Sequence, residues 1–501
     1  MSAGDALMSP AAGDDAKAEL GVNAQFSREA ESVEVTPSGP VIGLTKEQLE
    51  KYRNEPFYRT LRWILFALFW LTWAALFCGA LALIFLSPRK VKATPDPQKN
   101  ANAYEIFIPG FYDSDNNGEG DFAGVVQKFD YLADLNVDTL ILTPVFKTDK
   151  DHFSPVKTES WSEIDERFGG QGGFESLVKA AANKFKIFVD VPINENATVD
   201  KLVQGVKLVE KLGADGVYIV QPSNSTDIYD AKNLDLLING IRSEIPDEKF
   251  AIYVNSQELL DLATTKANVV VLDTVVENGE NVLDIFLASV ADAVNGNTSL
   301  TLVQNSVRRE RLGSKLPKEN RPSLLSLLNA LRLVAYPVAI NTYGDEVGLL
   351  DSASSRHESY LGYYPWDESA NHKGFTTFEE ALLFDPLVPA GTTDDQSDIR
   401  KKFSVLSTIR RNFKFGAAKT TKHTVIRDAA DGSGIYVLFF NPDNQDAQIK
   451  YSDILPSSVE GLNKVSIIHD DGVDSTKIED YTEKVEHFEP YQYRIVKLHN
   501  K

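Results

Sequence analysis

Cysteine is almost absent from this 501-residue chain, which contains only Cys78. With a single cysteine no intramolecular disulfide can form, so any folded part must be stable without one. Basic residues are also scarce, because 51 Lys and Arg stand against 72 Asp and Glu and the formal net charge is −21. Binding to nucleic acid needs a basic surface, and we therefore expect no nucleic-acid partner.

One long stretch lacks charge altogether. Residues 63–86 (WILFALFWLTWAALFCGALALIFL) contain no charged side chain, and Thr72 is their only conventional polar one. A helix of this length spans roughly 36 Å and so exceeds the ~30 Å hydrocarbon core of a bilayer. The alternatives are a buried helix of a soluble core and a signal peptide. The length of the apolar run and the long segment before it disfavour both, and we predict one uncleaved transmembrane helix.

The segments on either side of this helix differ in composition. Residues 1–62 are rich in small and acidic residues and predict a mostly disordered tail, whereas residues 87–100 predict a polar linker. Basic residues flank both ends of the helix, so the positive-inside rule hardly decides its orientation. Three N-x-S/T sequons, at Asn196, Asn224 and Asn297, follow the helix. They favour a cytosolic N-terminus and an extracellular, glycosylated C-terminal part.

Small residues recur inside the predicted membrane helix. Ala74, Cys78 and Ala82 are spaced every four residues, and Ala75 and Gly79 form a small-x-x-x-small pair. A face of small residues lets a neighbouring membrane helix pack closely. The alternative is chance in an Ala-rich segment. Cys78 itself is interpreted as a small packing residue, since a disulfide from the middle of a membrane is not expected.

From residue 101 onwards, short apolar runs alternate with amphipathic ones. The apolar runs predict strands at 104–109, 138–143, 186–191, 215–220, 249–254, 269–275, 299–304 and 337–342. Helices are predicted at about 121–135, 173–184, 198–212, 231–243, 256–265, 280–294, 322–334 and 394–412. This α/β pattern favours a (β/α)8 TIM barrel over 101–413, with a doubly wound open sheet as the alternative. Residues 414–501 lose the helical pattern and predict a C-terminal antiparallel β-sandwich.

Several stretches of this region resemble the α-amylase family of glycoside hydrolases. They are GEGDFAGVVQKFDYLADLNVDTLILTPVF (118–146), RFGGQGGFESLVKAA (167–181), DVPIN (190–194), ADGVYI (214–219) and PVAINTYGDEVGLL (337–350). The resemblance covers roughly residues 101–501 and implies the same barrel and terminal β domain. The family's inserted domain after strand 3 is absent, because DVPINENATVDKLVQ passes directly from strand to helix.

At the positions that match the catalytic residues of that family, this sequence has other residue types. The strand-4 pattern D-G-x-R-x-D is DGVYIV here, which places Val220 at the nucleophile position and Tyr218 at the arginine position. Asn255 stands where strand 5 carries the general acid, and Val307 replaces the third carboxylate. Retaining hydrolysis needs two carboxylates about 5–5.5 Å apart, so the resemblance implies a barrel without catalysis. The acids that remain nearby, which could alternatively form a substitute pair, are Glu258, Asp273 and Glu277.

The segment DSDNNGEGD after the first strand carries oxygen ligands at alternate positions. It resembles the first half of an EF-hand loop, but Gly124 stands where that loop has its bidentate Glu. It matches better the calcium loop of some α-amylase-family glucosidases, which implies a structural Ca²⁺. By that match the ligands are Asp113, Asp115, Asn117, the Glu119 carbonyl and Asp121. The alternative is an acidic turn without an ion.

A single anchor followed by an amylase-like barrel without its carboxylates looks like the heavy chain of heteromeric amino-acid transporters. The missing insertion is similar to the cell-surface-antigen heavy-chain type. The resemblance implies a non-catalytic ancillary subunit that stabilises a multi-spanning transporter light chain and carries it to the plasma membrane for amino-acid exchange. Residues 87–100 lack the family's linking cysteine, so we expect non-covalent association. A membrane-anchored α-glucosidase and an adhesion or receptor ectodomain are the alternatives.

Overall fold

The structure is a computed structural model of the chain and separates into two compact units, residues 1–91 and 92–501, which are described in turn. It describes residues 50, 52, 55–86, 100–149, 157–221, 229–246, 249–256, 266–273, 282–295, 300–303, 306–353, 358–414, 418–451, 462–469, 478–480 and 485–500.

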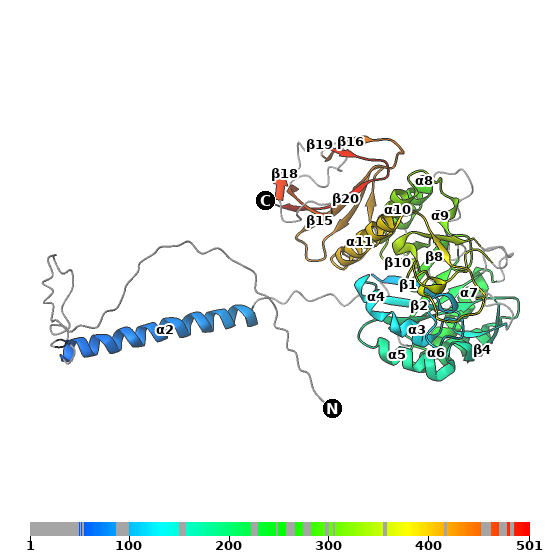
Figure 1. Cartoon of the computed structure of the whole chain (residues 1–501), viewed down its shortest axis with the longest axis horizontal. Coiled ribbons are helices and arrows are strands. Elements are labelled where there is room, and N and C mark those ends of the chain that lie inside the picture. The colour runs from blue at the N-terminus through cyan, green and yellow to red at the C-terminus, as the bar shows by residue number, and fades with distance from the viewer. Residues whose placement is uncertain are drawn as a thin grey trace, which may run out of the picture. The chain divides into compact units, whose positions relative to one another are not determined.

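The first unit contains helix α2, Pro56–Leu86, drawn in blue in Figure 1. It covers the whole predicted span 63–86 and begins earlier, at Pro56, where a proline suits the first helical turn. By length and composition its stretch Pro56–Gly79 is able to cross a membrane, and none of the apolar window within it is buried. The Thr72 hydroxyl donates to the Leu68 carbonyl at 2.8 Å, so the one polar side chain of the apolar run is satisfied within the helix.

Aromatic side chains form a ladder along α2. Trp63, Phe66, Trp70, Trp73 and Phe77 contact one another in sequence, with ring centroids 5.6 to 6.2 Å apart. Their spacing of three and four residues keeps them on one side of the helix. The rings are about half exposed or more, so α2 presents a wide apolar surface to its surroundings.

The second unit is built on one eight-stranded parallel sheet with the order β10-β1-β2-β5-β6-β7-β8-β9. The strands are β1 Asn102–Phe107, β2 Thr139–Thr143, β5 Lys186–Pro192, β6 Gly216–Val220, β7 Ala251–Asn255, β8 Val269–Asp273, β9 Leu300–Val303 and β10 Ala339–Thr342. Each of these strands overlaps a strand predicted from the sequence. Their apolar, β-branched composition suits a sheet that is covered on both faces.

The two ends of this strand order are close in space. Cα atoms of β9 and β10 approach within 8 Å, although no hydrogen-bonded ladder joins them among the residues that the structure describes. The observed architecture is therefore a parallel half-barrel of the (β/α) type. The closed eight-stranded barrel of the prediction is not established by the hydrogen bonding of these strands.

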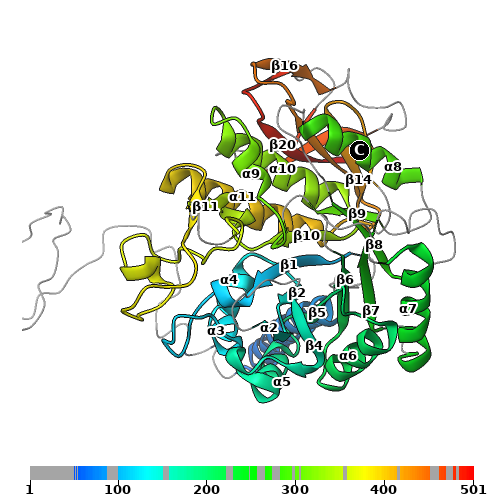
Figure 2. The same ribbon diagram turned by 90° about the vertical axis from the view of Figure 1, so that its right-hand side faces the viewer.

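Helices alternate with the strands and cover the outside of the sheet (Figure 2). They are α3 Phe122–Gln127, α4 Phe129–Asp134, α5 Gly170–Ala181, α6 Val199–Lys211, α7 Ala231–Glu244, α8 Val282–Asn295, α9 Leu312–Lys315, α10 Arg321–Ala335 and α11 Thr393–Arg410. The helix predicted over 121–135 is divided into α3 and α4 at Lys128. The predicted helix over 256–265 falls almost entirely outside the described residues.

The parallel sheet buries two distinct apolar layers, because successive side chains of a strand point to opposite faces. Tyr104, Leu140 and Val189 belong to the large core that also contains side chains of α5, α6 and α7. The alternate residues form a separate cluster on the inner face, which consists of Ala101, Ala103, Ile141, Phe188, Tyr218, Val220, Ala251, Tyr253, Val269, Val271, Val338 and Ile340.

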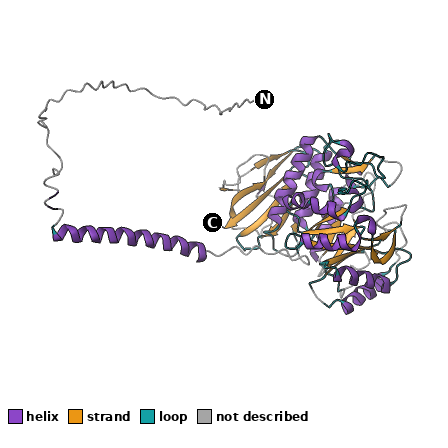
Figure 3. Ribbon diagram, turned by 60° about the horizontal axis from the view of Figure 1, so that its bottom comes forward, coloured by secondary structure: helices purple, strands orange, loops and turns teal. Residues whose placement is uncertain are grey.

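Antiparallel sheets follow the parallel one and appear as orange strands in Figure 3. A six-stranded sheet has the order β13-β14-β15-β20-β17-β18, and β16 pairs with β19. These strands are β13 Lys419–Thr420, β14 Thr424–Asp428, β15 Gly434–Phe440, β16 Ala447–Lys450, β17 Leu462–His469, β18 Ile478–Asp480, β19 Val485–Phe488 and β20 Tyr493–Asn500. Phe439, Ile449 and Phe488 pack in one cluster, which joins the two sheets.

Two short antiparallel strand pairs were not predicted from the sequence. β3 (Phe146–Thr148) pairs with β4 (Thr158–Ile164), and β11 (Leu349–Ser352) pairs with β12 (Leu387–Pro389). Both pairings are antiparallel and irregular in register, and each joins segments that lie between successive strands of the parallel sheet or after its last strand.

Asp138, at the amino end of β2, generates a prediction about pH. Its carboxylate accepts hydrogen bonds from the Asn102 amide at 3.0 and 3.1 Å, and burial raises the pKa of Asp138 to about 6. The folded protein thus holds this proton more tightly than an unfolded chain, in which the pKa of Asp is about 3.9. Stability contributed by this group must fall as pH rises from about 4 to 6.

We expect the difference between Tm of the wild type and Tm of Asp138→Asn to fall as pH rises over this range. Above about pH 7 this difference should be constant. Thermal unfolding of the two proteins in parallel measures this. A difference that does not vary with pH would contradict the assigned titration.

Candidate functional site

The inner face of the parallel sheet becomes polar toward the carboxyl ends of its strands. Each polar residue lies two positions after a member of the inner apolar cluster and therefore shares its face. We call this set the carboxyl-end layer, and it consists of Glu105, Thr143, Asp190, Asn255 and Thr342. Active sites of (β/α) barrels lie at this end of the strands, so the carboxyl-end layer is the candidate functional site.

Two of the three positions at which the resemblance predicts a lost catalytic residue lie at this edge. Val220 and Asn255 are the last residues of β6 and β7 and are register partners. Val220 is buried in the inner cluster, whereas the Asn255 amide donates to the Tyr218 hydroxyl at 3.3 Å. Val307 is fully buried, but it belongs to the large core and not to the inner cluster. Neither a valine nor a neutral amide can supply the carboxylates that glycoside hydrolysis requires.

The acids considered as a substitute pair are only partly described. Asp273 is the last residue of β8, at the same edge of the sheet. Glu258 and Glu277 lie outside the described residues.

Sequence reasoning missed two acids that the structure places in the carboxyl-end layer. Glu105 of β1 and Asp190 of β5 are each 1 % exposed, and both contact the guanidinium of Arg308. Arg308 Nη1 donates to Glu105 Oε1 at 3.0 Å, and Nη2 donates to Asp190 Oδ2. The Arg308 side chain is itself only 4 % exposed and comes from the segment between β9 and α9. The three residues form a buried ion triad.

Each of the two carboxylates also accepts a hydrogen bond from a threonine hydroxyl. Thr342 Oγ1 donates to Glu105 Oε2 at 3.2 Å, and Thr143 Oγ1 donates to Asp190 Oδ2 at 2.6 Å. Two atoms of the triad, Asp190 Oδ1 and Arg308 Nε, are buried and have no hydrogen-bond partner in the described part of the chain. The Arg308 guanidinium also lies 6.0 Å from the centre of the Tyr218 ring.

The electrostatics of the triad follow from burial and charge. Burial raises the pKa of Glu105 and of Asp190, and the guanidinium of Arg308 opposes that rise. Burial alone would lower the pKa of Arg308, but Asp190 and Glu105 raise it above its ordinary value. Both carboxylates are thus committed to one cation. A hydrolase needs one proton-carrying acid and one unencumbered carboxylate, and this arrangement supplies neither.

A sequence signal for the triad exists in retrospect. YEIF and VDVP are strands that are otherwise apolar on both faces, and each contains one acid. A buried carboxylate needs a partner of opposite charge, so a lone acid in such a strand predicts a buried cation nearby. The sequence does not say which arginine that is.

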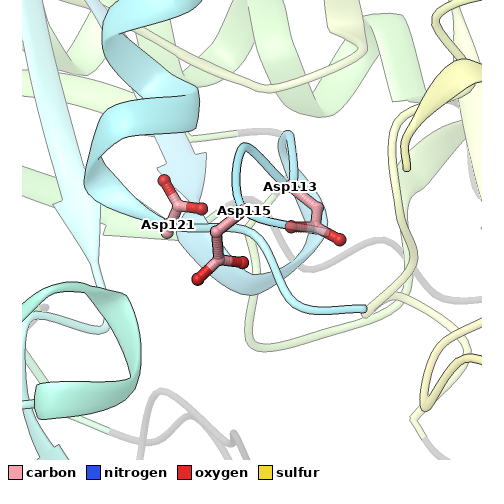
Figure 4. Close-up of side chains that lie close together, drawn as sticks. All are labelled: Asp113, Asp115 and Asp121. Carbon is pink, nitrogen blue, oxygen red and sulfur yellow. The ribbon is translucent and has the colours of Figure 1, made fainter. Parts of the chain in front are cut away.

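The loop between β1 and α3 gathers the carboxylates of the predicted calcium site (Figure 4). Carboxylate oxygens of Asp113, Asp115 and Asp121 lie within 4.8 Å of one another. Gly118 has φ 92°, a left-handed conformation that glycine adopts without strain and that turns the loop back toward α3. The carboxylate of Asp121 also caps α3 by accepting from the Gly124 amide at 2.6 Å.

The oxygen atoms of this loop differ in how much of their bonding capacity is used. Asp113 accepts from the backbone amides of Asn116 and Gly118, both at 2.8 Å, and from the Thr376 hydroxyl at 2.5 Å. Asp115 accepts from Asn117, through its backbone amide and its side chain, and its one further hydrogen bond among the described residues is with the Asp113 side chain. Asp115 therefore keeps the most room for a cation, and the donors are the hard oxygens that suit Ca²⁺.

Burial and neighbouring carboxylates raise two pKa values in the loop. The pKa of Asp115 is raised by burial, by its hydrogen bond with Asp113 and by the charge of Asp121. Burial also raises the pKa of Glu119, with Asp165, Asp113 and Asp115 adding to the rise while Arg167 opposes it. The Asn117 side-chain oxygen accepts from the Glu119 amide at 2.8 Å. The five predicted ligands thus share one loop, and the three carboxylates among them lie close together.

The other predicted sites are placed as follows. Ala74, Ala75, Cys78 and Gly79 are exposed on α2, and a Cβ added at Gly79 would meet no atom within 4 Å. Ala82 lies in the same helix, but its side chain is outside the described set. Asn196 is exposed in the turn before α6, and Thr198 of the same sequon is the N-cap of that helix. Asn224 and Asn297 lie outside the described residues.

Comparison with protein families divides the chain at the start of the parallel sheet. Residues 31–104 match the model described as Solute carrier family 3 member 2 N-terminus, which includes α2. Residues 105–271 match the model described as Alpha amylase, catalytic domain.

Two similar proteins are amino acid transporter heavy chains. The rabbit (Oryctolagus cuniculus) heavy chain SLC3A2 is 24% identical over 420 residues, which cover 79% of this chain and 73% of that protein. The mouse (Mus musculus) heavy chain SLC3A1 is 35% identical over 167 residues, which cover 32% of this chain. That match spans only 23% of the length of the mouse protein.

Similar solved structures are sugar-converting enzymes. A mutant of the isomaltulose synthase from Erwinia rhapontici NX5, in complex with D-glucose, has a TM-score of 0.63 and 13% identity, covering 81% of this chain and 99% of that one. A mutant of the trehalulose synthase MutB has a TM-score of 0.61 and 11% identity, covering 80% and 99%. At this identity the likeness concerns the fold alone. The chain belongs to the SLC3A family of amino acid transporter heavy chains and carries an α-amylase-like domain.

Proposed function

We propose that this chain is the non-catalytic heavy subunit of a heteromeric amino-acid exchanger. In this role it associates with a multi-spanning transporter light chain, stabilises it and brings it to the plasma membrane. The observation that carries the proposal is the match of residues 31–104, which include the apolar helix, to the N-terminal model of an SLC3 heavy chain. The apolar or neutral residues Val220, Asn255 and Val307 at the positions of the catalytic carboxylates support it.

The proposal includes the arrangement of the chain across the membrane. Residues 1–62 form the cytosolic tail, α2 crosses the plasma membrane, and residues 87–100 form the extracellular linker. The ectodomain then comprises a closed (β/α)8 barrel over 101–413 and a β-sandwich over 414–501. The approach of β9 to β10 within 8 Å supports closure, and the cluster shared by the two antiparallel sheets supports the sandwich.

The partner helix is proposed to pack, without a covalent link, on the small-residue face of α2. This face consists of Ala74, Ala75, Cys78, Gly79 and Ala82. Its support is the open space around Gly79, because a helix without side-chain bulk allows the closest backbone approach. The aromatic ladder, whose rings lie at other positions of the helix, is left to contact lipid or further partner helices.

We also propose that the loop after β1 binds a structural Ca²⁺ through Asp113, Asp115, Asn117, the Glu119 carbonyl and Asp121. The support is the close approach of three carboxylates and the raised pKa of Asp115, since a cation would relieve the repulsion between like charges. The bound ion would tie the loop to the start of α3 through Asp121.

The subunit role predicts a specific companion. Purification of the full-length protein from membranes in mild detergent should retrieve a polytopic amino-acid transporter, and deletion of this chain should reduce amino-acid exchange at the cell surface. Recovery of the chain alone with unchanged transport would contradict the proposal. Turnover of maltose or an aryl glucoside by the purified protein would favour the glucosidase alternative.

The packing face predicts a position-dependent effect of bulk. Ala75→Leu should reduce recovery of the light chain several-fold, because a larger side chain separates the helix backbones. Ala80→Leu is the matched control, since position 80 lies about 140° around the helix from position 75. Equal recovery with the two variants would remove the small-residue face from the interface.

The calcium loop predicts a stability that depends on the ion. Addition of Ca²⁺ to chelator-treated protein should raise Tm by several degrees, and Asp115→Asn should abolish most of this rise. Asp130→Asn, at an exposed acid in the first turn of α4, is the control and should keep the full response. A response that is absent in the wild type, or equal in both variants, would exclude the proposed ligands.

An extracellular ectodomain predicts glycosylation at the exposed sequon. Asn196→Gln should remove one N-linked glycan from protein made in mammalian cells, seen as a faster-migrating band that glycosidase treatment no longer shifts to the same extent. Thr198→Ser keeps both the sequon and the helix cap and should migrate like the wild type. Identical migration of Asn196→Gln and wild type would count against a glycan at this position.

A further inference from the structure

The buried triad of Glu105, Asp190 and Arg308, in the carboxyl-end layer, has the composition of a binding site for an organic cation. We propose that this end of the sheet is a guanidinium-binding site that the chain fills with its own Arg308. In this view Arg308 is an internal ligand, and the position that a substrate occupies in barrel enzymes is closed from within. The inference does not depend on which transporter the chain accompanies.

The recognition groups come from separate parts of the sheet. Glu105 is on β1 and Asp190 is on β5, with β2 between them in the strand order. Their carboxylates meet different nitrogen atoms of one guanidinium, Nη1 and Nη2. A planar, forked cation suits two carboxylates in a way that the compact ammonium of lysine does not.

Both carboxylates have hydrogen-bond partners besides the arginine. Thr342 and Thr143 each donate a hydroxyl to one of the carboxylates, so both acids have a positioning partner on a neighbouring strand. The Tyr218 ring lies alongside the guanidinium at 6.0 Å, within reach of a cation–π interaction. Carboxylates with fixed positions and an aromatic side are the elements of a binding site for a flat organic cation.

The contacts of Arg308 with the sheet indicate how an internal ligand stabilises the fold. Arg308 is held in the segment between β9 and α9, and its contacts reach β1 and β5 on the far part of the strand order. Two buried carboxylates without a cation would be strongly destabilising, because each charge would lose its hydration without compensation. The guanidinium therefore offsets part of the negative charge of this layer and joins the segment between β9 and α9 to β1 and β5.

The experiment replaces the internal ligand by an external one. Arg308→Ala of the full-length protein in detergent should lower Tm by about 5 °C or more, because it leaves two buried carboxylates unpaired. Millimolar ethylguanidinium should restore part of this loss in the variant and leave wild-type Tm unchanged. Ethylammonium at the same concentration should restore clearly less.

Two further variants complete the test. In Arg308→Ala/Glu105→Gln, the ethylguanidinium effect should be strongly reduced, because one of the two carboxylates has lost its charge. Arg308→Lys should have a Tm below that of the wild type, since one ammonium cannot replace the fork, and this comparison decides the matter if Arg308→Ala does not fold. An Arg308→Lys protein as stable as the wild type, an unchanged Tm in Arg308→Ala, or equal rescue by ethylammonium would overturn the proposal.

Discussion

Burial of the parallel sheet on both faces is the constraint on which the rest of the second unit, residues 92–501, depends. The outer face packs against α5, α6 and α7, and the inner face fills with a cluster of its own. Because neither face meets water, every polar side chain on these strands needs a partner within the protein. The Glu105–Arg308–Asp190 triad is the clearest consequence, since the two buried carboxylates share one buried guanidinium.

The same constraint allows this fold to form without the carboxylates that glycoside hydrolysis requires. The inner layers that hold the strands together are apolar and do not require a catalytic carboxylate at Val220 or a general acid at Asn255. Two further carboxylates at this edge would add negative charge beside Glu105 and Asp190, which already outnumber their single cation. A valine and a neutral amide at these positions are therefore compatible with the buried triad and with the parallel half-barrel.

Helix α2 differs from the parallel sheet, because its apolar side chains are exposed. Its backbone groups are satisfied within the helix, its Thr72 hydroxyl is bonded to its own backbone, and its large side chains are exposed. A surface of this kind is stable only in lipid or against other apolar helices. The two units thus differ: residues 92–501 are stabilised by a core of their own, whereas the apolar side chains of α2 are exposed.

Sequence patterns alone determined the apolar helix and the strands of the parallel sheet, but not the pairs β3–β4 and β11–β12. The charge-free run predicts α2, and apolar runs alternating with amphipathic ones predict all eight strands of the parallel sheet, because these signals are local and periodic. Motif spacing also predicts Val220, Asn255 and Val307 as replacements of the catalytic residues of the amylase family. Only the tertiary structure decided which polar residues meet, since Arg308 contacts an acid 203 positions away and another 118 positions away. Such contacts depend on strand order and register, and a period of two or 3.6 residues carries no information about either.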